Sequence, residues 1–245
     1  MDSLGVSCSL SREHHGLGLS TIVARALFLN TQSASMDIEN VQKSIDAVMS
    51  DLKLIEERRE KLIKGTRDVI MLCSKSIVSL HNGKHDNASE QVNKAKELLD
   101  ELRQTAQTDL YRYIIGAETE LVEANALRSI ISGSSIPSMQ SLNVNGNSYI
   151  LGLLDCVGEL KRLVYDKIRT GKSDDAKNLF ALMEQIYALL FPFAAYDNIV
   201  QGVRRKLDVA RILIEDTRAA VTEDSRRLAM LDAIDKLYGK LSKVV

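Results

Sequence analysis

Two pairs of carboxylates stand out in the middle of the chain because each lies within an otherwise apolar stretch. Glu120 and Glu123 are three residues apart in TDLYRYIIGAETELVEANALRSII, and Asp155 and Glu159 are four residues apart in YILGLLDCVGELKRLVYDKI. Residues three or four apart share a face of an α-helix. The sequence therefore predicts two helices that each present two acidic groups on one side.

Four carboxylates in a mostly apolar setting need a counter-charge. Like charges about 4 Å apart repel by ~4 kcal/mol at an effective dielectric near 20, and burial adds several kcal/mol per ion. Such a cluster retains protons or binds a cation, and oxygen ligands without His or Cys favour Mg²⁺, or Mn²⁺, over Zn²⁺. An ion held by these four groups can activate a water molecule and bind a phosphate oxygen. The predicted chemistry is hydrolysis of a phosphoester or phosphoanhydride.

Either acidic pair alone has an ordinary explanation, because closely spaced carboxylates are common on solvated helix faces. Two pairs on successive apolar helices are the less common feature, and this favours a metal site over a solvated surface. The 31 residues between Glu123 and Asp155 leave room for a helix end, a loop and an antiparallel return.

Long helices are expected to position the acids. Apolar residues recur three and four apart from Ile38 to Leu80, where His81-Asn82-Gly83 predicts a helix end, with a bend or break left open at Gly65. The segment 132–148 is rich in Ser, Asn and Gly, and its length predicts a mobile or functional loop. Ser173 is expected to cap the helix that follows it. The further helices are expected over residues 88–105, 109–131, 149–169, 174–190, 197–220 and 223–240.

The composition supports this helical interpretation. The chain has 245 residues, 45% of them hydrophobic, with only 2 Pro and 13 Gly, which are too few for the many turns of an all-β fold. A formal net charge of −1 excludes a histone-like basic protein. Three scattered cysteines form neither a disulfide framework nor a zinc spacing, and they fit a reducing cytosol. We therefore expect an all-α, cytoplasmic protein built as a single bundle of about seven helices.

The domain prediction is a flexible N-terminal tail, residues 1–35, followed by a helical domain, residues 36–245. The tail shows no sustained hydrophobic period, and Met36 is a candidate start because a regular pattern begins just after it. The apolar run 22–29 is interrupted by Arg25 and is too short to span a bilayer. We expect no membrane interaction.

Four stretches resemble the translin family. They are ERREKLIKGTRDVIMLCSKSIVSLH (57–81), LYRYIIGAETELVEANALRSII (110–131), YILGLLDCVGELKRLVYDKIRTGKSDDA (149–176) and AYDNIVQGVRRKLDVARILIEDTRAAV (195–221). The resemblance covers about residues 38–222 and is most specific in GLLDCVGEL with the Gly-Lys-Ser-Asp turn that follows. It is closest to the nuclease-competent branch, translin-associated factor X.

This resemblance implies a seven-helix fold that assembles into octamers and binds single-stranded RNA or DNA. In the nuclease-competent branch, acids in E-x-x-E and D-x-x-x-E motifs bind Mg²⁺ and cut RNA. Glu120 and Glu123 match the first motif here, and Asp155 and Glu159 match the second. The resemblance therefore implies a Mg²⁺-dependent endoribonuclease, as a homo-octamer or a hetero-oligomer with a translin-like subunit.

Two sets of basic residues are candidates for contacting phosphates. Arg204, Arg205, Lys206 and Arg211 form one set, and Arg58, Arg59, Lys61, Lys64 and Arg67 form the other. Glutamates interleave with the latter set, as on any exposed helix. The family likeness implies a nucleic-acid-binding role for Lys61, Lys64 and Arg67, whose contribution to RNA affinity should weaken as salt rises.

Two alternatives stay open on the sequence alone. One is an all-α nucleoside-triphosphate pyrophosphohydrolase, although those enzymes usually space their second acidic pair by three residues rather than four. The other is a non-catalytic scaffold that binds single-stranded nucleic acid without Mg²⁺. Nothing in the proposed chemistry requires a 2′-hydroxyl, so the nuclease expectation extends to single-stranded DNA.

Overall fold

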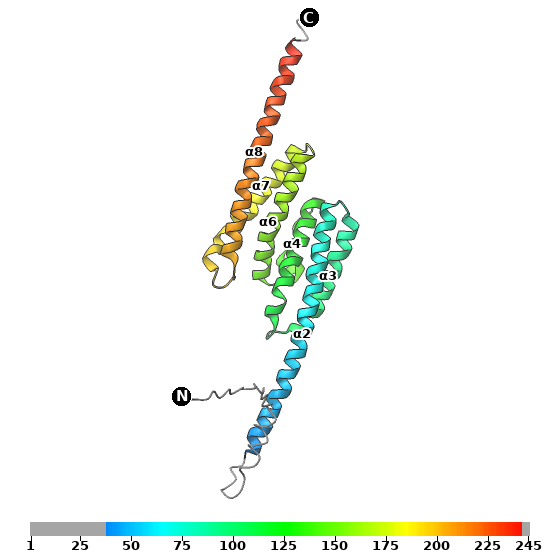
Figure 1. Cartoon of the computed structure of the whole chain (residues 1–245), viewed down its shortest axis with the longest axis vertical. Helices are drawn as coiled ribbons and strands as arrows, with labels where there is room; N and C mark the ends of the chain where they lie inside the picture. Colours follow the sequence, from blue (N-terminus) through cyan, green and yellow to red (C-terminus); the bar gives the residue numbers. More distant parts are fainter. Residues whose placement is uncertain (1–37, 242–245) are drawn as a thin grey trace, which may run out of the picture. The chain divides into compact units, whose positions relative to one another are not determined.

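The computed structural model describes residues 38–241, and every regular element in that range is helical (Figure 1). Seven α-helices confirm the predicted all-α class. Their bounds are α2 Glu39–His81, α3 His85–Ala106, α4 Ile115–Ser132, α5 Met139–Leu142, α6 Gly146–Arg169, α7 Ser173–Leu190 and α8 Val203–Leu241. Short 3-10 helices, η1 Tyr111–Tyr113 and η2 Phe191–Tyr196, precede α4 and α8.

The chain divides into two units, residues 1–51 and 52–245. In the first unit the described residues, 38–51, are the first turns of α2, and their side chains are exposed. The expected tail, residues 1–35, and the candidate start at Met36 lie outside the described residues. Both acidic pairs belong to the second unit, which is considered by itself below.

The acidic helices lie in the middle of the second unit. In Figure 1, α4 lies between α3 and α6, and α6 packs in turn against α7 and α8. All residues of α4 from Ala117 to Leu127 are buried except Glu120, so the apolar stretch around the first acidic pair lies deep in this unit. Its apolar side chains join those of α3, α6 and α7 in one continuous core.

Helix ends follow the predicted glycines in two places. Gly83 has a φ of +70° after α2, and the Lys84 N–H donates to the Ser79 carbonyl at 2.9 Å. Gly171 has a φ of +72° after α6, and the Lys172 N–H donates to the Lys167 carbonyl at 2.9 Å. A left-handed residue after the last turn satisfies otherwise unpaired carbonyls, and glycine adopts that conformation without a Cβ clash.

Several expected helix boundaries differ from the structure. The helices expected over 197–220 and 223–240 form one helix, α8, because the residues between them include no Gly or Pro to stop it. α2 continues through Gly65, where a Cβ atom would lie 2.5 Å from Cδ2 of Leu102 on α3. Ser173 is the first residue of α7 rather than its cap, and its side chain forms no capping bond.

The connection between α4 and α6 has a defined structure. It contains α5, which sequence periodicity did not predict because four residues are too few to show a period. Leu142 and Val144 pack against Val122 of α4, and the Tyr149 hydroxyl donates to the Pro137 carbonyl at 2.9 Å. The Asn145 side chain caps α6 by accepting from the Asn147 N–H at 2.8 Å. The loop therefore sets where α6 begins.

One described segment is long and apolar enough, by length and composition, to cross a membrane. It covers residues 173–196 with a mean hydropathy of 1.4. Within the unit, α7 packs against α6 and α8 through Met183, Ile186 and Leu190. Leu189 and Phe191 remain exposed, so this segment also carries an apolar outer surface.

Candidate metal and nucleic-acid site

A glycine brings the two acidic helices together. A Cβ atom on Gly152 of α6 would lie 2.5 Å from the carbonyl oxygen of Thr119 and 2.7 Å from Cβ of Val122, both on α4. Real Cβ atoms do not approach backbone that closely, so no larger residue fits without shifting a helix. Gly152 lies one turn before Asp155, so the closest approach of the helices is next to the acids.

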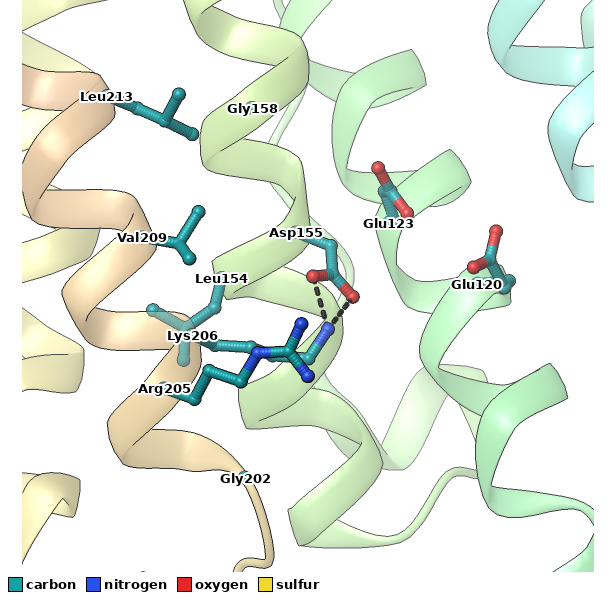
Figure 2. Close-up of a pocket in the computed structure, with 10 residues that line it drawn as sticks. All are labelled: Glu120, Glu123, Leu154, Asp155, Gly158, Gly202, Arg205, Lys206, Val209 and Leu213. Carbon is teal, nitrogen blue, oxygen red and sulfur yellow. Dashed lines mark hydrogen bonds and ion pairs between the residues drawn. The ribbon is translucent and has the colours of Figure 1, made fainter.

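Three of the four predicted acids line one cavity of about 570 Å³. Glu120 and Glu123 lie on α4, across the cavity from Asp155 on α6 (Figure 2). Arg205 and Lys206 reach the same cavity from α8. The cavity thus joins an acidic wall from two helices to two cationic side chains from a third.

Burial and mutual repulsion control the charge of the acidic wall. Glu123 is 9% exposed. Burial, followed by the charges of Glu120, Asp155 and Glu159, raises the pKa of Glu123 to about 8, against the opposing charge of Lys206. Burial and then the charge of Asp155 also raise the pKa of Glu120. Part of the cluster therefore holds protons near neutral pH when no cation is bound.

The negative charge of Asp155 is balanced by an ion pair with Lys206. Lys206 Nζ contacts both carboxylate oxygens of Asp155 and bridges α8 to α6 (Figure 2). Arg205, the next residue along, is exposed and forms no hydrogen bond or ion pair with the described residues. On the cationic side of the cavity, Lys206 is therefore paired with an acid, whereas the Arg205 side chain is available to bind an anion.

Glu159 lies one turn beyond Asp155 and is bound to a histidine. Its Oε2 contacts His81 Nε2, and the His81 side chain is 1% exposed. The sequence favours a capping or solvent role for His81 because it ends α2, whereas the structure buries it against α6. A contact between residues 78 positions apart leaves no signal in local spacing.

A third carboxylate on α4, Glu118, serves a structural purpose that the sequence does not reveal. It is fully buried and accepts hydrogen bonds from four groups. The donors are Arg103 Nε at 3.1 Å, the Tyr111 hydroxyl at 2.7 Å, the Asn145 N–H at 3.1 Å and the Ser148 hydroxyl at 2.8 Å. Glu118 thereby ties α3 and the start of α6 to α4.

The chemistry of the acidic donors fits a hard divalent cation, since carboxylates are the available ligands and neither Glu120 nor Glu123 accepts a side-chain hydrogen bond from the described residues. The thiols nearby are inert: burial and then the charges of Glu120 and Glu123 raise the pKa of Cys73 to about 12. Cys156 is also fully buried and forms no disulfide with the described residues. In the described residues no three His, Cys, Asp or Glu side chains stand ready to hold a metal ion. Binding would require side chains to turn.

The predicted nucleic-acid-binding set lies elsewhere. Lys61, Lys64 and Arg67 are exposed on α2, do not line the cavity and form no ion pair with the described residues. Tyr113 is half-buried, and its ring lies beneath the guanidinium of Arg112 at 5.0 Å. The structure therefore brings Arg205 and Lys206 to the acids, and none of the basic residues of α2 lines the cavity.

Comparison with known proteins identifies the family. The model of the translin family matches residues 110–216, which include the four acids and Lys206. This chain is 32% identical in sequence to AfC3PO, whose crystal structure superposes on it with a TM-score of 0.70. The alignment covers 75% of this chain and 98% of the AfC3PO chain. The chain belongs to the translin family. This favours the translin-like alternatives over a pyrophosphohydrolase.

Two further relatives of this translin-family chain extend the comparison. A structure of AfC3PO in complex with duplex RNA is 31% identical, covers 75% of this chain and 97% of its own, and has a TM-score of 0.69. An uncharacterised protein of Methanocaldococcus jannaschii is 28% identical over 188 residues, or 76% of this chain and 84% of that protein.

Proposed function

We propose that this protein binds RNA and hydrolyses its phosphodiester bonds with Mg²⁺ at the cavity between α4, α6 and α8. The observation that carries the proposal is the meeting of Glu120, Glu123 and Asp155 in one cavity with Arg205 and Lys206. An acidic wall suits a divalent cation, and a cationic rim suits the phosphate that the cation would activate. The complete acidic set also supports assignment to the nuclease-competent branch.

The four acids would hold the ion, with Mn²⁺ as the other cation that suits them. When bound, Mg²⁺ neutralises their charge, polarises a phosphate oxygen and supplies a nucleophilic water. The chain's own contribution is orientation, because α4 and α6 are locked together at Gly152. The carboxylate that is least engaged with the ion would take the proton from the attacking water.

RNA binding is supported by relatives and by charge. AfC3PO has been crystallised with duplex RNA. For this chain we propose single-stranded RNA as the substrate, with single-stranded DNA as a second, since a flexible strand can reach into a cavity. Arg205 is placed to bind the phosphate being cut, and Lys61, Lys64 and Arg67 to bind more distant phosphates.

Oligomerisation belongs to the same proposal. α8 exposes Leu231, Leu237 and Tyr238 on its last turns, and exposed apolar side chains in such number are typical of subunit contacts. We propose a homo-octamer, or a hetero-oligomer with a translin-like subunit.

Cleavage of labelled single-stranded RNA in Mg²⁺ or EDTA tests the function. Wild type should cut only with Mg²⁺. Glu123→Gln and Asp155→Asn should each lose more than about a hundredfold in rate, since changing even groups behind metal ligands costs 10- to 100-fold. Glu184→Gln is the control, because Glu184 pairs with Arg218 away from the cavity. Full activity in either acidic-site variant would refute the assignment.

The second candidate is a scaffold that binds nucleic acid without cutting it. The Lys206–Asp155 contact favours it, because this pair satisfies Asp155 without any metal. The same assay separates the two functions: a scaffold would bind equally in Mg²⁺ and EDTA and return intact RNA.

A further inference from the structure

Lys206 is the cation closest to the acidic wall. Its Nζ contacts both Oδ1 and Oδ2 of Asp155, so it takes the two oxygens that Asp155 would offer to a metal. The pair is neither deeply buried nor free, with side chains 34% and 28% exposed. Water therefore reaches the contact, and the lysine can leave without being stranded in an apolar core.

The charge of Lys206 extends to the other acids. Its side chain lines the same cavity as Glu120 and Glu123, and among the described residues its hydrogen bonds go to Asp155. Lys206 thus partly balances three carboxylates from a single position. A bound divalent cation would perform the same electrostatic task with twice the charge.

Lysine and metal cannot both occupy this position. A metal ligand needs free oxygen lone pairs, and a dication repels an ammonium group a few ångströms away. The described side chains form no ready metal site while Lys206 contacts Asp155. We infer that Lys206 is a displaceable counter-ion: it holds Asp155 in the metal-free protein, releases it when a divalent cation binds, and then binds a phosphate of the RNA.

Once released from Asp155, the ammonium group of Lys206 can bind a phosphate that enters the same cavity. Its neighbour Arg205 already lines the cavity without a partner among the described residues, so the cationic rim faces the space a phosphate would enter. The lysine side chain is a point charge on a flexible stem and can redirect its ammonium without moving α8. Metal loading therefore strengthens RNA binding through the chain's own lysine. This inference rests on the proposed function, because it assumes that the acids bind a metal.

The test compares two lysines that each bridge α6 and α8. Lys206→Met removes the counter-ion, and Lys161→Met removes the matched control, since Lys161 on α6 pairs with Asp216 on α8 outside the cavity. Mn²⁺ binding to the RNA-free protein is measured by electron paramagnetic resonance. Lys206→Met should bind Mn²⁺ about fivefold more tightly, because an ion pair worth about 1 kcal/mol no longer competes. Lys161→Met should match wild type.

RNA affinity should change in the opposite direction. It is measured in the Glu120→Gln background, which prevents cleavage, with saturating Mn²⁺ and a short labelled single-stranded RNA. Lys206→Met should weaken binding several-fold and lower the slope of log affinity against log salt by about 0.7, the value for one phosphate contact on a single strand. Lys206→Arg keeps the charge and should restore weaker Mn²⁺ binding.

The outcomes separate this inference from the function beneath it. If wild type binds Mn²⁺ but Lys206→Met binds it equally or more weakly, Lys206 is not a competing counter-ion and only the inference fails. If wild type binds no Mn²⁺, or binds it as well after Glu123→Gln, the metal assignment fails and the inference with it. Tighter Mn²⁺ binding combined with weaker RNA binding is expected from displacement, whereas a merely structural lysine would not move the two in opposite directions.

Discussion

Glu118 and Glu123 show how two buried carboxylates on one helix can have opposite effects on stability. Glu118 is fully buried and accepts four hydrogen bonds, so its charge is compensated. Glu123 has no hydrogen-bonding partner in the described part of the chain, and burial raises its pKa to about 8. Glu118 therefore stabilises the folded protein, whereas ionised Glu123 destabilises it.

The metal-free protein should become less stable as pH rises from about 5 to 8. Folded Glu123 has a pKa of about 8 against an ordinary value of 4.5, so the folded state binds its proton more tightly. The resulting stabilisation is fully present below pH 4.5 and is lost as pH rises through 8, by at most about 5 kcal/mol. Thermal melts in EDTA across this range should show the loss, and saturating Mg²⁺ should reverse it.

Two substitutions on α4 provide the controls. Glu123→Gln should flatten the pH dependence and stabilise the metal-free protein at pH 8, because the amide cannot ionise. Glu118→Gln should destabilise by about 2–4 kcal/mol at every pH, since it breaks a buried charged network. A Glu123→Gln protein that keeps the wild-type pH profile would contradict the assignment of the titration to Glu123.

The sequence predicted the individual acids better than their partners. Spacing of three and four placed each pair on one helix face, and the structure brings Glu120, Glu123 and Asp155 to one cavity. The contacts of Glu118 and of His81 were missed, because each depends on residues from other helices. Their sequence separation carries no periodic signal.

At the scale of elements, the close approach of α4 and α6 depends on Gly152. Gly152→Ala should destabilise the protein by about 1–3 kcal/mol, because the new Cβ would overlap the Thr119 carbonyl at 2.5 Å. RNA cleavage should fall with it, since the acids would move apart. Urea unfolding provides the measurement.

Gly158 is the matched control on the same helix. Its Cβ would meet Leu213 Cδ1 at 3.8 Å, an ordinary contact, so Gly158→Ala should leave stability unchanged or raise it by about 1 kcal/mol through helix propensity. Equal losses in the two variants would show that the Gly152 contact does not limit helix packing.

Helices with a long apolar period were predictable, and their junctions were not. The body of α2, α3, α4, α6 and α7 follows the pattern of apolar residues. The helices expected over 197–220 and 223–240 are one helix, α8. The absence of Gly and Pro between them was the sequence signal for a continuous helix, and the interruption in the apolar pattern concealed it. The loop 132–148 was expected to be mobile or functional, and the structure ties its Asn145 and Ser148 to Glu118. Buried hydrogen bonds, rather than loop composition, determine its order.

At the scale of the whole molecule, the exposed apolar residues of α8 should hold subunits together. Leu231 and Leu237 are 52% and 57% exposed. The double change Leu231→Glu with Leu237→Glu should lower the mass in solution toward a single 27.2 kDa chain, measured by light scattering after size exclusion.

The control for this variant matches its charge. Lys236→Glu on the same helix also lowers the net charge by two, but Lys236 is exposed and paired with Asp232. It should keep the wild-type mass. If both proteins dissociate alike, net charge rather than apolar contact would be responsible.

The positions of Arg103 and His81 have a consequence for dissecting the protein. The stretch that matches the translin family, 110–216, holds every acid and Lys206, yet Arg103 and His81 both precede it. An excised peptide of that stretch would keep the four acids of the proposed site, but it would lose Arg103, one of the four donors to Glu118, and His81, the partner of Glu159. The residues of the proposed site thus lie within 110–216, whereas two of the side chains that support α4 and α6 come from the helices before that stretch.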